Sequence, residues 1–191
     1  MIIFMCDDDP LANIKTEKYL RSYFKTIGIK DYKIYSFSCG EDAVSSKLIP
    51  DIAFLDVEME GISGIKTAEV LKKKNDSLIV FILTSFSDYL DAAMRENVFR
   101  YLSKPLEKER LFRNMKDAVN LYFSQTKSVE IETKDRRIVI PLKKVICIES
   151  ERHSSVFHTT DGDYLATKPL RYWVDSIRLP CFYQQIGRAH V

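Results

Sequence analysis

Short apolar runs alternate with amphipathic stretches through the first 125 residues. Five runs rich in Ile, Phe, Leu and Val have the length and composition of β-strands. The first, third and fourth show little polar alternation, which is typical of parallel strands covered on both faces. Strands that alternate with helices pair in parallel through right-handed crossovers, so we predict a doubly wound α/β domain. The runs are Ile2–Cys6, Ile34–Phe37, Ile52–Leu55, Leu78–Leu83 and Phe99–Leu102.

Helix signals lie between and after these runs. Asp9-Pro10 is a favourable helix start, because an acidic N-cap precedes proline in the first turn. Gly28 supplies a C-terminal stop for that helix. Apolar residues at helical spacing mark two more helices, one with Ile65, Ala68 and Leu71, and one with Leu111, Met115, Ala118 and Tyr122.

The remainder of the chain has a different pattern. Residues 124–128 are polar and predict a short linker. Beyond them, apolar residues alternate with polar ones, and the Asp161-Gly162 pair between two apolar runs predicts a hairpin. Only the stretch from Leu170 to Ile177 has helical spacing. We expect a mostly-β module over residues 129–191.

Composition narrows the class of protein. With 46% hydrophobic and 29% charged residues, the chain is typical of a globular protein. The longest apolar runs have six residues, too few to span a membrane, and the N-terminus has no export signal, so we expect a cytoplasmic protein without a membrane partner. The four cysteines match no metal or redox motif. The net charge is only +2, with a modest basic excess of 11 Lys and Arg over 8 Asp and Glu in residues 126–191.

Chemically distinctive residues follow the predicted strands. In doubly wound sheets the site lies at the carboxyl ends of the strands. Carboxylates that converge there repel one another, and a hard divalent cation such as Mg²⁺ would relieve the repulsion. A carboxylate beside the cation can accept a phosphoryl group, while a hydroxyl and an ammonium hold its oxygens. The residues are Asp7, Asp8 and Asp9, then Asp56, Thr84-Ser85 and Lys104-Pro105. Each has an ordinary structural explanation taken singly, and capping the first helix is the favoured one for Asp9.

Residues 1–122 resemble the receiver domain of two-component response regulators, a flavodoxin-like fold with a five-stranded parallel sheet. The resemblance rests on four motifs that match in order along the chain. They are Cys6-Asp7-Asp8-Asp9-Pro10, Phe54-Leu55-Asp56 with Gly64 eight residues on, Leu83-Thr84-Ser85, and Tyr101-Leu102-Ser103-Lys104-Pro105.

The resemblance implies a role for each matching residue. Asp56 would be the phosphoacceptor, with Asp7, Asp8 and the Glu58 backbone carbonyl beside it as Mg²⁺ ligands. Thr84 would be the switch hydroxyl, Lys104 the phosphate-sensing ammonium, and Tyr101 the aromatic that turns inward with Thr84. The chain departs from the family at Glu60, where a proline is common, and at Glu58, where many members have another residue.

The β module resembles the N-terminal part of a LytTR-type DNA-binding domain. The matching features are Ile138–Leu142, Ile146–Ser150, His153 through His158 and the Leu170–Ile177 helix. In that family loops enter successive major grooves, and His153 matches the base-contacting residue of the first loop. Arg152 and Arg171 are candidates for phosphate contacts by charge, whereas His158 is expected to be an ordinary strand residue.

The chain ends on Ile186-Gly187-Arg188-Ala189-His190-Val191, where the LytTR family continues into further strands. This hexapeptide is similar to the translation of a common sequencing adapter. We therefore expect a C-terminally truncated LytTR module over residues 129–191, after a receiver over 1–123 and a linker over 124–128, and we assign Arg188 and His190 no role.

Together the resemblances imply a non-enzymatic, phosphorylation-activated transcription regulator. A sensor histidine kinase would phosphorylate Asp56, and the surface around Asp88–Arg100 and the last strand of the receiver would then favour a homodimer that binds paired direct repeats in promoter DNA. Three alternatives stay open. The β module could bind protein, the chain could be an aspartyl-phosphate phosphatase with Glu58 as its second acid, or the receiver could act without phosphorylation.

Overall fold

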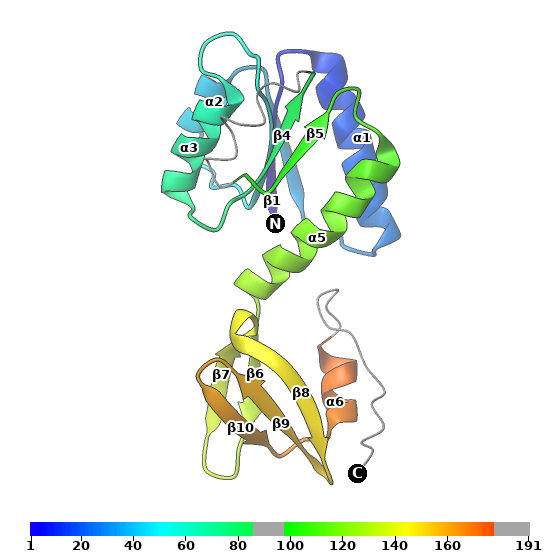
Figure 1. The fold of residues 1–191 in the computed structure, drawn as a ribbon, viewed down its shortest axis with the longest axis vertical. Helices are drawn as coiled ribbons and strands as arrows, with labels where there is room; N and C mark the ends of the chain where they lie inside the picture. The colour runs from blue at the N-terminus through cyan, green and yellow to red at the C-terminus, as the bar shows by residue number, and fades with distance from the viewer. Residues whose placement is uncertain (86–97, 178–191) are drawn as a thin grey trace. The chain divides into compact units, whose positions relative to one another are not determined.

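The computed structural model describes residues 1–85 and 98–177. The chain divides into two compact units, Met1–Ala118 and Val119–Val191, which Figure 1 shows in order along the chain. Within the described residues, no helix is both long and apolar enough to cross a membrane. The described part excludes residues 88–97 of the expected dimerisation surface and the C-terminal segment from residue 178.

The first unit contains the predicted doubly wound sheet. All five strands pair in parallel, in the order β2-β1-β3-β4-β5, which is the flavodoxin-like order. Helices α2 and α3 cover one face, and α1 and the first part of α5 cover the other (Figure 1). The elements are β1 (Ile2–Cys6), α1 (Pro10–Thr26), β2 (Lys33–Phe37), α2 (Gly40–Ser45), β3 (Ile52–Asp56), α3 (Gly64–Lys74), β4 (Ile79–Thr84), β5 (Arg100–Ser103) and α5 (Lys108–Thr126).

The central strands are buried on both faces, as their uninterrupted apolar runs predict. Every residue of β3 and β4 is buried. On the face covered by α2 and α3, the core includes Phe4, Leu55 and Ile82. The Phe54 and Phe81 rings stack with centroids 4.6 Å apart. These apolar contacts hold the strands in register. The residues that follow the strands therefore meet at the carboxyl end of the sheet.

Helix α1 begins and ends where the sequence signals predicted, whereas helix α2 was not predicted. The Asp9 side chain caps α1 by accepting a hydrogen bond from the Leu11 N–H at 2.9 Å, which confirms the capping interpretation of this residue. Gly28 has a φ of 72° and follows the end of α1 as expected. The sequence did not predict α2, because six residues are too few to show helical periodicity.

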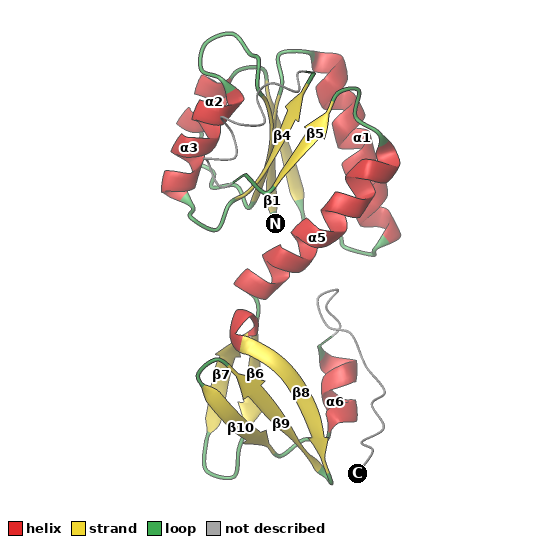
Figure 2. Ribbon diagram, viewed as in Figure 1, coloured by secondary structure: helices red, strands yellow, loops and turns green. Residues whose placement is uncertain are grey.

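The second unit is the expected mostly-β module. It contains a two-stranded sheet, β6-β7, and a three-stranded antiparallel sheet, β10-β9-β8 (Figure 2). Phe157 and Trp173 pack edge to face in its core, with ring centroids 5.0 Å apart. The elements are β6 (Ser128–Glu132), β7 (Arg137–Pro141), the 3₁₀ turn η1 (Leu142–Lys144), β8 (Val145–Glu151), β9 (Ser154–Thr159), β10 (Gly162–Ala166) and α6 (Leu170–Ser176).

The polar segment 124–128, predicted as a short linker, contains the end of α5 and the start of β6. Helix α5 continues to Thr126 and β6 begins at Ser128, so Lys127 alone lies between the two elements. Two side-chain hydroxyls bond backbone carbonyls of the last turns of this helix. Ser124 donates to the Leu121 carbonyl and Thr126 to the Tyr122 carbonyl, each at 2.8 Å, as the helix ends.

Gly64 packs closely against the end of β3, so its substitution tests the fold at the β3–α3 junction. A Cβ at this position would lie 1.9 Å from the Asp56 carbonyl oxygen, so alanine cannot fit without moving backbone. We expect Gly64→Ala to lower the free energy of unfolding by about 2 kcal/mol or more in urea denaturation.

Gly28→Ala is the matched control for this test. Position 28 has open space around the added Cβ but a positive φ, so we expect a loss of about 1 kcal/mol. A Gly64→Ala protein as stable as the unmodified chain would contradict the close approach of Gly64 to β3.

Candidate functional site

Three carboxylates converge at the carboxyl end of the parallel sheet. Asp7 and Asp8 follow β1, and Asp56 is the last residue of β3. One oxygen from each lies within 4.8 Å of the other two. Asp7 and Asp56 are buried, at 2% and 7% exposure, whereas Asp8 is exposed. The structure therefore brings together the acidic residues that the strand-end pattern singled out.

Lys104 supplies the positive charge of this acidic cluster. Its ammonium lies 2.7 Å from Asp56 Oδ2, to which it donates a hydrogen bond, and 2.8 Å from Asp7 Oδ2. The Lys104 backbone N–H donates to the Thr84 carbonyl at 2.8 Å, which fastens the residue after β5 to the end of β4. The fold thus places one ammonium between two carboxylates at the ends of different strands.

Burial and charge shift the pKa values of this group of side chains. Burial raises the pKa of Asp7, although Lys104 and a hydrogen bond from the Asp9 backbone N–H oppose the shift. Burial lowers the pKa of Lys104, but its contacts with Asp56 and Asp7 outweigh burial and leave that pKa raised. Lys104 therefore stays protonated and cationic.

The cluster fits a hard divalent cation such as Mg²⁺. Its three donors are carboxylate oxygens, the ligand type that Mg²⁺ prefers. Asp7 Oδ2 is buried, and its 2.8 Å contact with Lys104 lacks the geometry of a hydrogen bond, so it retains unused acceptor capacity. The Glu58 carboxylate is not a member of the cluster, and Glu58 lies exposed in the loop after β3.

Thr84 and Tyr101 lie on neighbouring strands beside the acidic cluster. Thr84 is the last residue of β4 and is 5% exposed. Tyr101 pairs with Ile82 across the β4–β5 register, and its half-buried ring packs against the core that α2 and α3 cover. Alternation along the strands places Thr84 on the same face as Ile82 and Tyr101. The Thr84 and Tyr101 side chains therefore share the face of the sheet that α2 and α3 cover.

Two residues that position this site were missed from the sequence. Arg110, on α5, donates hydrogen bonds to the Ser103 hydroxyl and, at 3.3 Å, to the Tyr101 carbonyl, so it braces β5, the strand that Lys104 directly follows. Glu41, on α2, accepts a hydrogen bond from the Ile62 N–H at 2.8 Å and holds the β3–α3 loop. Neither residue follows a predicted strand, so the strand-end pattern could not select it. Each bonds a segment that is not adjacent to it in the sequence.

The candidate DNA contacts lie apart from the acidic cluster in the sequence and belong to the second unit. Arg152 and His153 form the exposed turn between β8 and β9, and Arg152 has a left-handed φ of 53°. Arg171 is exposed on α6. His158 is a strand residue whose ring contacts Asp163 and Glu149, and hydrogen bonds to these carboxylates raise its pKa.

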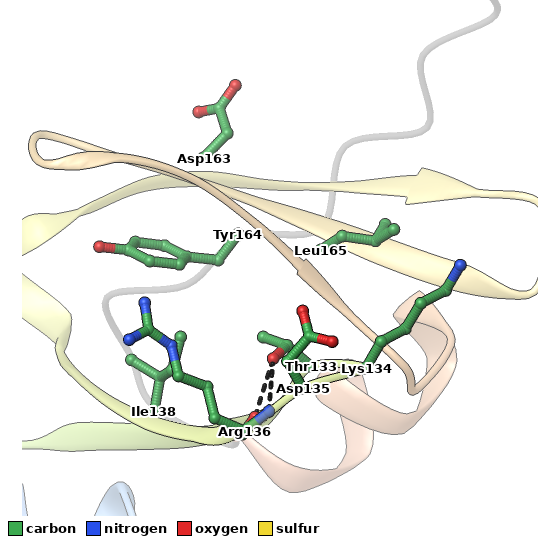
Figure 3. Close-up of a pocket in the computed structure, with 8 residues that line it drawn as sticks. All are labelled: Thr133, Lys134, Asp135, Arg136, Ile138, Asp163, Tyr164 and Leu165. Carbon is green, nitrogen blue, oxygen red and sulfur yellow. Dashed lines mark hydrogen bonds between the residues drawn. The ribbon is translucent and has the colours of Figure 1, made fainter.

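The second unit also has a shallow groove between the β6–β7 turn and β10. Its volume is about 270 Å³, and its lining includes Lys134, Arg136 and Tyr164 (Figure 3). Asp135 and Asp163 also line it, so opposite charges are mixed around the groove. Thr133 and Arg136 close the adjoining turn through hydrogen bonds. This arrangement indicates no particular ligand.

Comparisons with known proteins agree with this geometry. Residues 3–116 match the family model described as the response regulator receiver domain. The chain is 30% identical over 170 residues to the transcriptional regulatory protein BtsR of Escherichia coli, covering 83% of this chain and 69% of BtsR. It is 33% identical over 135 residues to the sensory transduction protein LytT of Bacillus cereus, covering 69% of this chain and 50% of LytT.

A solved structure supports the fold of the first unit. The response regulator TrrA of Thermotoga maritima, in complex with Mg²⁺ and BeF, is 25% identical, with a TM-score of 0.51 over 61% of this chain and 97% of TrrA. The chain spans about half the length of several curated relatives, including 44% of BtsR from Salmonella typhi.

The position of Lys104 between two buried carboxylates generates a prediction about stability. Lys104→Met removes the ammonium and leaves Asp7 and Asp56 to repel each other, so we expect the free energy of unfolding to fall by about 2 kcal/mol in metal-free buffer. Urea denaturation with and without Mg²⁺ measures this effect. The cation should recover much of the loss, because it neutralises the same carboxylates.

Lys108→Met is the matched control, since it removes an exposed lysine near the start of the same helix that carries Arg110. We expect it to change stability by less than about 0.5 kcal/mol. Equal effects of the two substitutions would show that Lys104 does not stabilise the acidic cluster.

Proposed function

This chain belongs to the response regulators, and on that premise we propose that it is a phosphorylation-activated regulator of transcription. Asp56 accepts a phosphoryl group from a sensor histidine kinase, and the receiver then controls a LytTR-type DNA-binding module. The proposal rests on one observation. Asp7, Asp8 and Asp56 form a cluster of carboxylates, and the Lys104 ammonium contacts two of them, Asp7 and Asp56. The similarity to BtsR, a transcriptional regulatory protein, supports the output.

We assign the receiver to residues 1–123, the connecting segment to 124–128 and the DNA-binding module to 129–191. The compact units Met1–Ala118 and Val119–Val191 support a division in this part of the chain. The first unit contains every residue of the phosphorylation chemistry, and the second contains every candidate DNA contact.

Asp56 is suited to act as the nucleophile. One of its oxygens attacks phosphorus, the phosphorus–nitrogen bond to the kinase histidine breaks, and a new phosphorus–oxygen bond forms on Asp56. Lys104, which pairs with Asp56 before the reaction, then holds a phosphoryl oxygen. Asp7, Asp8, Asp56 and the Glu58 carbonyl would hold Mg²⁺, which supplies charge neutralisation at the phosphoryl group when bound.

Phosphorylation acts on the rest of the receiver through Thr84 and Tyr101. The added charge draws the Thr84 hydroxyl toward the phosphoryl group and leaves space for Tyr101 to turn inward, which shifts a pre-existing equilibrium between inactive and active forms. The half-buried position of Tyr101 beside Ile82 supports this role. The active form favours a homodimer through the surface around Asp88–Arg100.

The β module reads DNA through its β8–β9 turn. His153 contacts a base and Arg152 a phosphate, and the exposure of both side chains supports these roles. Two modules in one dimer bind paired direct repeats, so dimer geometry sets the spacing of the half-sites. Arg171 is a further phosphate contact.

The acceptor assignment predicts the behaviour of Asp56→Asn. The amide cannot form an acyl phosphate, so we expect labelling by radioactive acetyl phosphate with Mg²⁺ to be abolished, with the fold retained by circular dichroism. Asp51→Asn is the control, because Asp51 directly precedes β3 and its side chain accepts a hydrogen bond from the Ile2 backbone N–H, away from the acidic cluster. Undiminished labelling of Asp56→Asn would refute the assignment.

The DNA contacts predict separate effects of two substitutions. His153→Ala should weaken binding to direct-repeat promoter DNA about tenfold and reduce discrimination against unrelated DNA. Arg152→Ala should weaken binding to both kinds of DNA and flatten the dependence on salt, because one phosphate contact is lost. Gel shifts at several salt concentrations measure both effects.

Thr160→Ala, at the exposed β9–β10 turn, is the control for these substitutions and should bind normally. If the phosphorylated protein shows no preference for promoter repeats at any salt concentration, the β module is a protein-binding output instead.

A further inference from the structure

Four side chains with metal-binding chemistry share the outer face of the three-stranded sheet. Strand alternation directs Ile148, Phe157 and Tyr164 toward the core of the second unit. Their neighbours therefore lie on the opposite, solvent-facing side of the sheet. These outward residues are Cys147 and Glu149 on β8, His158 on β9 and Asp163 on β10.

His158 is at the centre of this group. Its Nδ1 lies 3.0 Å from Asp163 Oδ1, and its Nε2 lies 3.2 Å from Glu149 Oε2. Two ligand atoms on one tetrahedral zinc ion are about 3.3 Å apart, given zinc–nitrogen and zinc–oxygen bonds of about 2.0–2.2 Å. The separation of Nε2 from the Glu149 carboxylate thus matches a pair of zinc ligands.

Asp163 provides a partner for the other ring nitrogen. A metal-binding histidine usually donates its second N–H to a carboxylate, which fixes the ring orientation and its tautomer. Asp163 Oδ1 is positioned to accept that hydrogen bond from Nδ1. The orientation of His158 therefore leaves Nε2 as the nitrogen that would bind a metal.

Cys147 supplies the third donor. It is a free, exposed cysteine and lies directly opposite His158 in the β8–β9 register. Opposite residues in antiparallel strands have Cβ atoms about 5 Å apart, so a thiol can reach its neighbour by a change of side-chain rotamer. That change is required, because within residues 1–85 and 98–177 only Asp7, Asp8 and Asp56 already bring three such ligand atoms within 4.8 Å.

We propose that Cys147, Glu149 and His158 form a site for a thiophilic divalent cation of the zinc type, with Asp163 orienting the histidine. Binding releases the thiol proton and any proton on His158 Nε2, and a water molecule completes the tetrahedron. Sulfur and nitrogen donors distinguish this site from the all-oxygen cluster of the receiver, which favours Mg²⁺. The site is independent of the proposed phosphorylation chemistry.

The cation would link the strands of this sheet. Two of its ligands are on β8 and one is on β9, and the hydrogen bond from His158 to Asp163 extends the connection to β10. The β8–β9 pair also carries the Arg152–His153 turn. Binding would therefore stabilise the strands that present the proposed DNA contacts.

Cobalt(II) is a suitable probe, because a bound thiolate produces a charge-transfer band in the near ultraviolet. The full chain, freed of metal with a chelator and kept reduced, is titrated with Co²⁺ at mildly alkaline pH. We expect a band that saturates at one equivalent and disappears when Zn²⁺ is added. Cys147→Ser and His158→Asn should each abolish it, and Asp163→Asn should weaken Co²⁺ binding about tenfold to a hundredfold.

Two control variants locate the signal. Cys39→Ser removes another free thiol, and Asp56→Asn alters the receiver cluster, so both should retain the band. Circular dichroism verifies that every variant is folded. The absence of a band in the folded unmodified chain, or a band that persists in Cys147→Ser, would overturn the proposal and leave Glu149, His158 and Asp163 as a surface ion-pair network.

Discussion

Electrostatic balance at the end of the parallel sheet is the constraint on which the receiver depends. Three carboxylates lie within 4.8 Å of one another, and two of them are buried, an arrangement that folding alone would disfavour. Lys104 makes it possible by placing its ammonium within 2.8 Å of both Asp7 and Asp56. The carboxylates that repel one another are the ligands we propose for Mg²⁺, and the ammonium that balances them is the group we propose to hold a phosphoryl oxygen. The proposed chemistry therefore uses the same contacts that balance charge in the fold.

The scaffold keeps these charges in place through apolar packing and backbone hydrogen bonds. The buried residues of β3 and β4 keep the two strands in register, so their ends lie side by side. Gly64, which lacks a side chain, allows α3 to begin close to the Asp56 carbonyl. Arg110 and Glu41 then secure the two loops that flank the acidic cluster. The second unit uses its strands differently. There the inner face forms a core around Phe157 and Trp173, and the outer face displays polar side chains at regular spacing.

Much of the architecture was predictable because it depends on local patterns. The apolar runs identified all five strands of the parallel sheet, and the Asp9-Pro10 pair located the start of α1. Strand-end position also selected Asp7, Asp56, Thr84 and Lys104 before any geometry was known. The short helix α2 was missed because six residues cover fewer than two turns. The segment 124–128 was predicted as a linker because its composition is polar, and in the structure Ser124–Thr126 are the last residues of α5.

The sequence by itself determined the order of strands and helices apart from the short helix α2, the chemical type of each strand-end residue and the family resemblance, because hydrophobic periodicity and short motifs are properties of neighbouring residues. Tertiary structure alone decided that Lys104 contacts both Asp7 and Asp56, that Arg110 braces β5, and that Cys147 lies opposite His158. These contacts join residues that are distant along the chain. They depend on strand register and on side-chain direction, which follow from packing of the whole sheet and not from any local stretch of sequence.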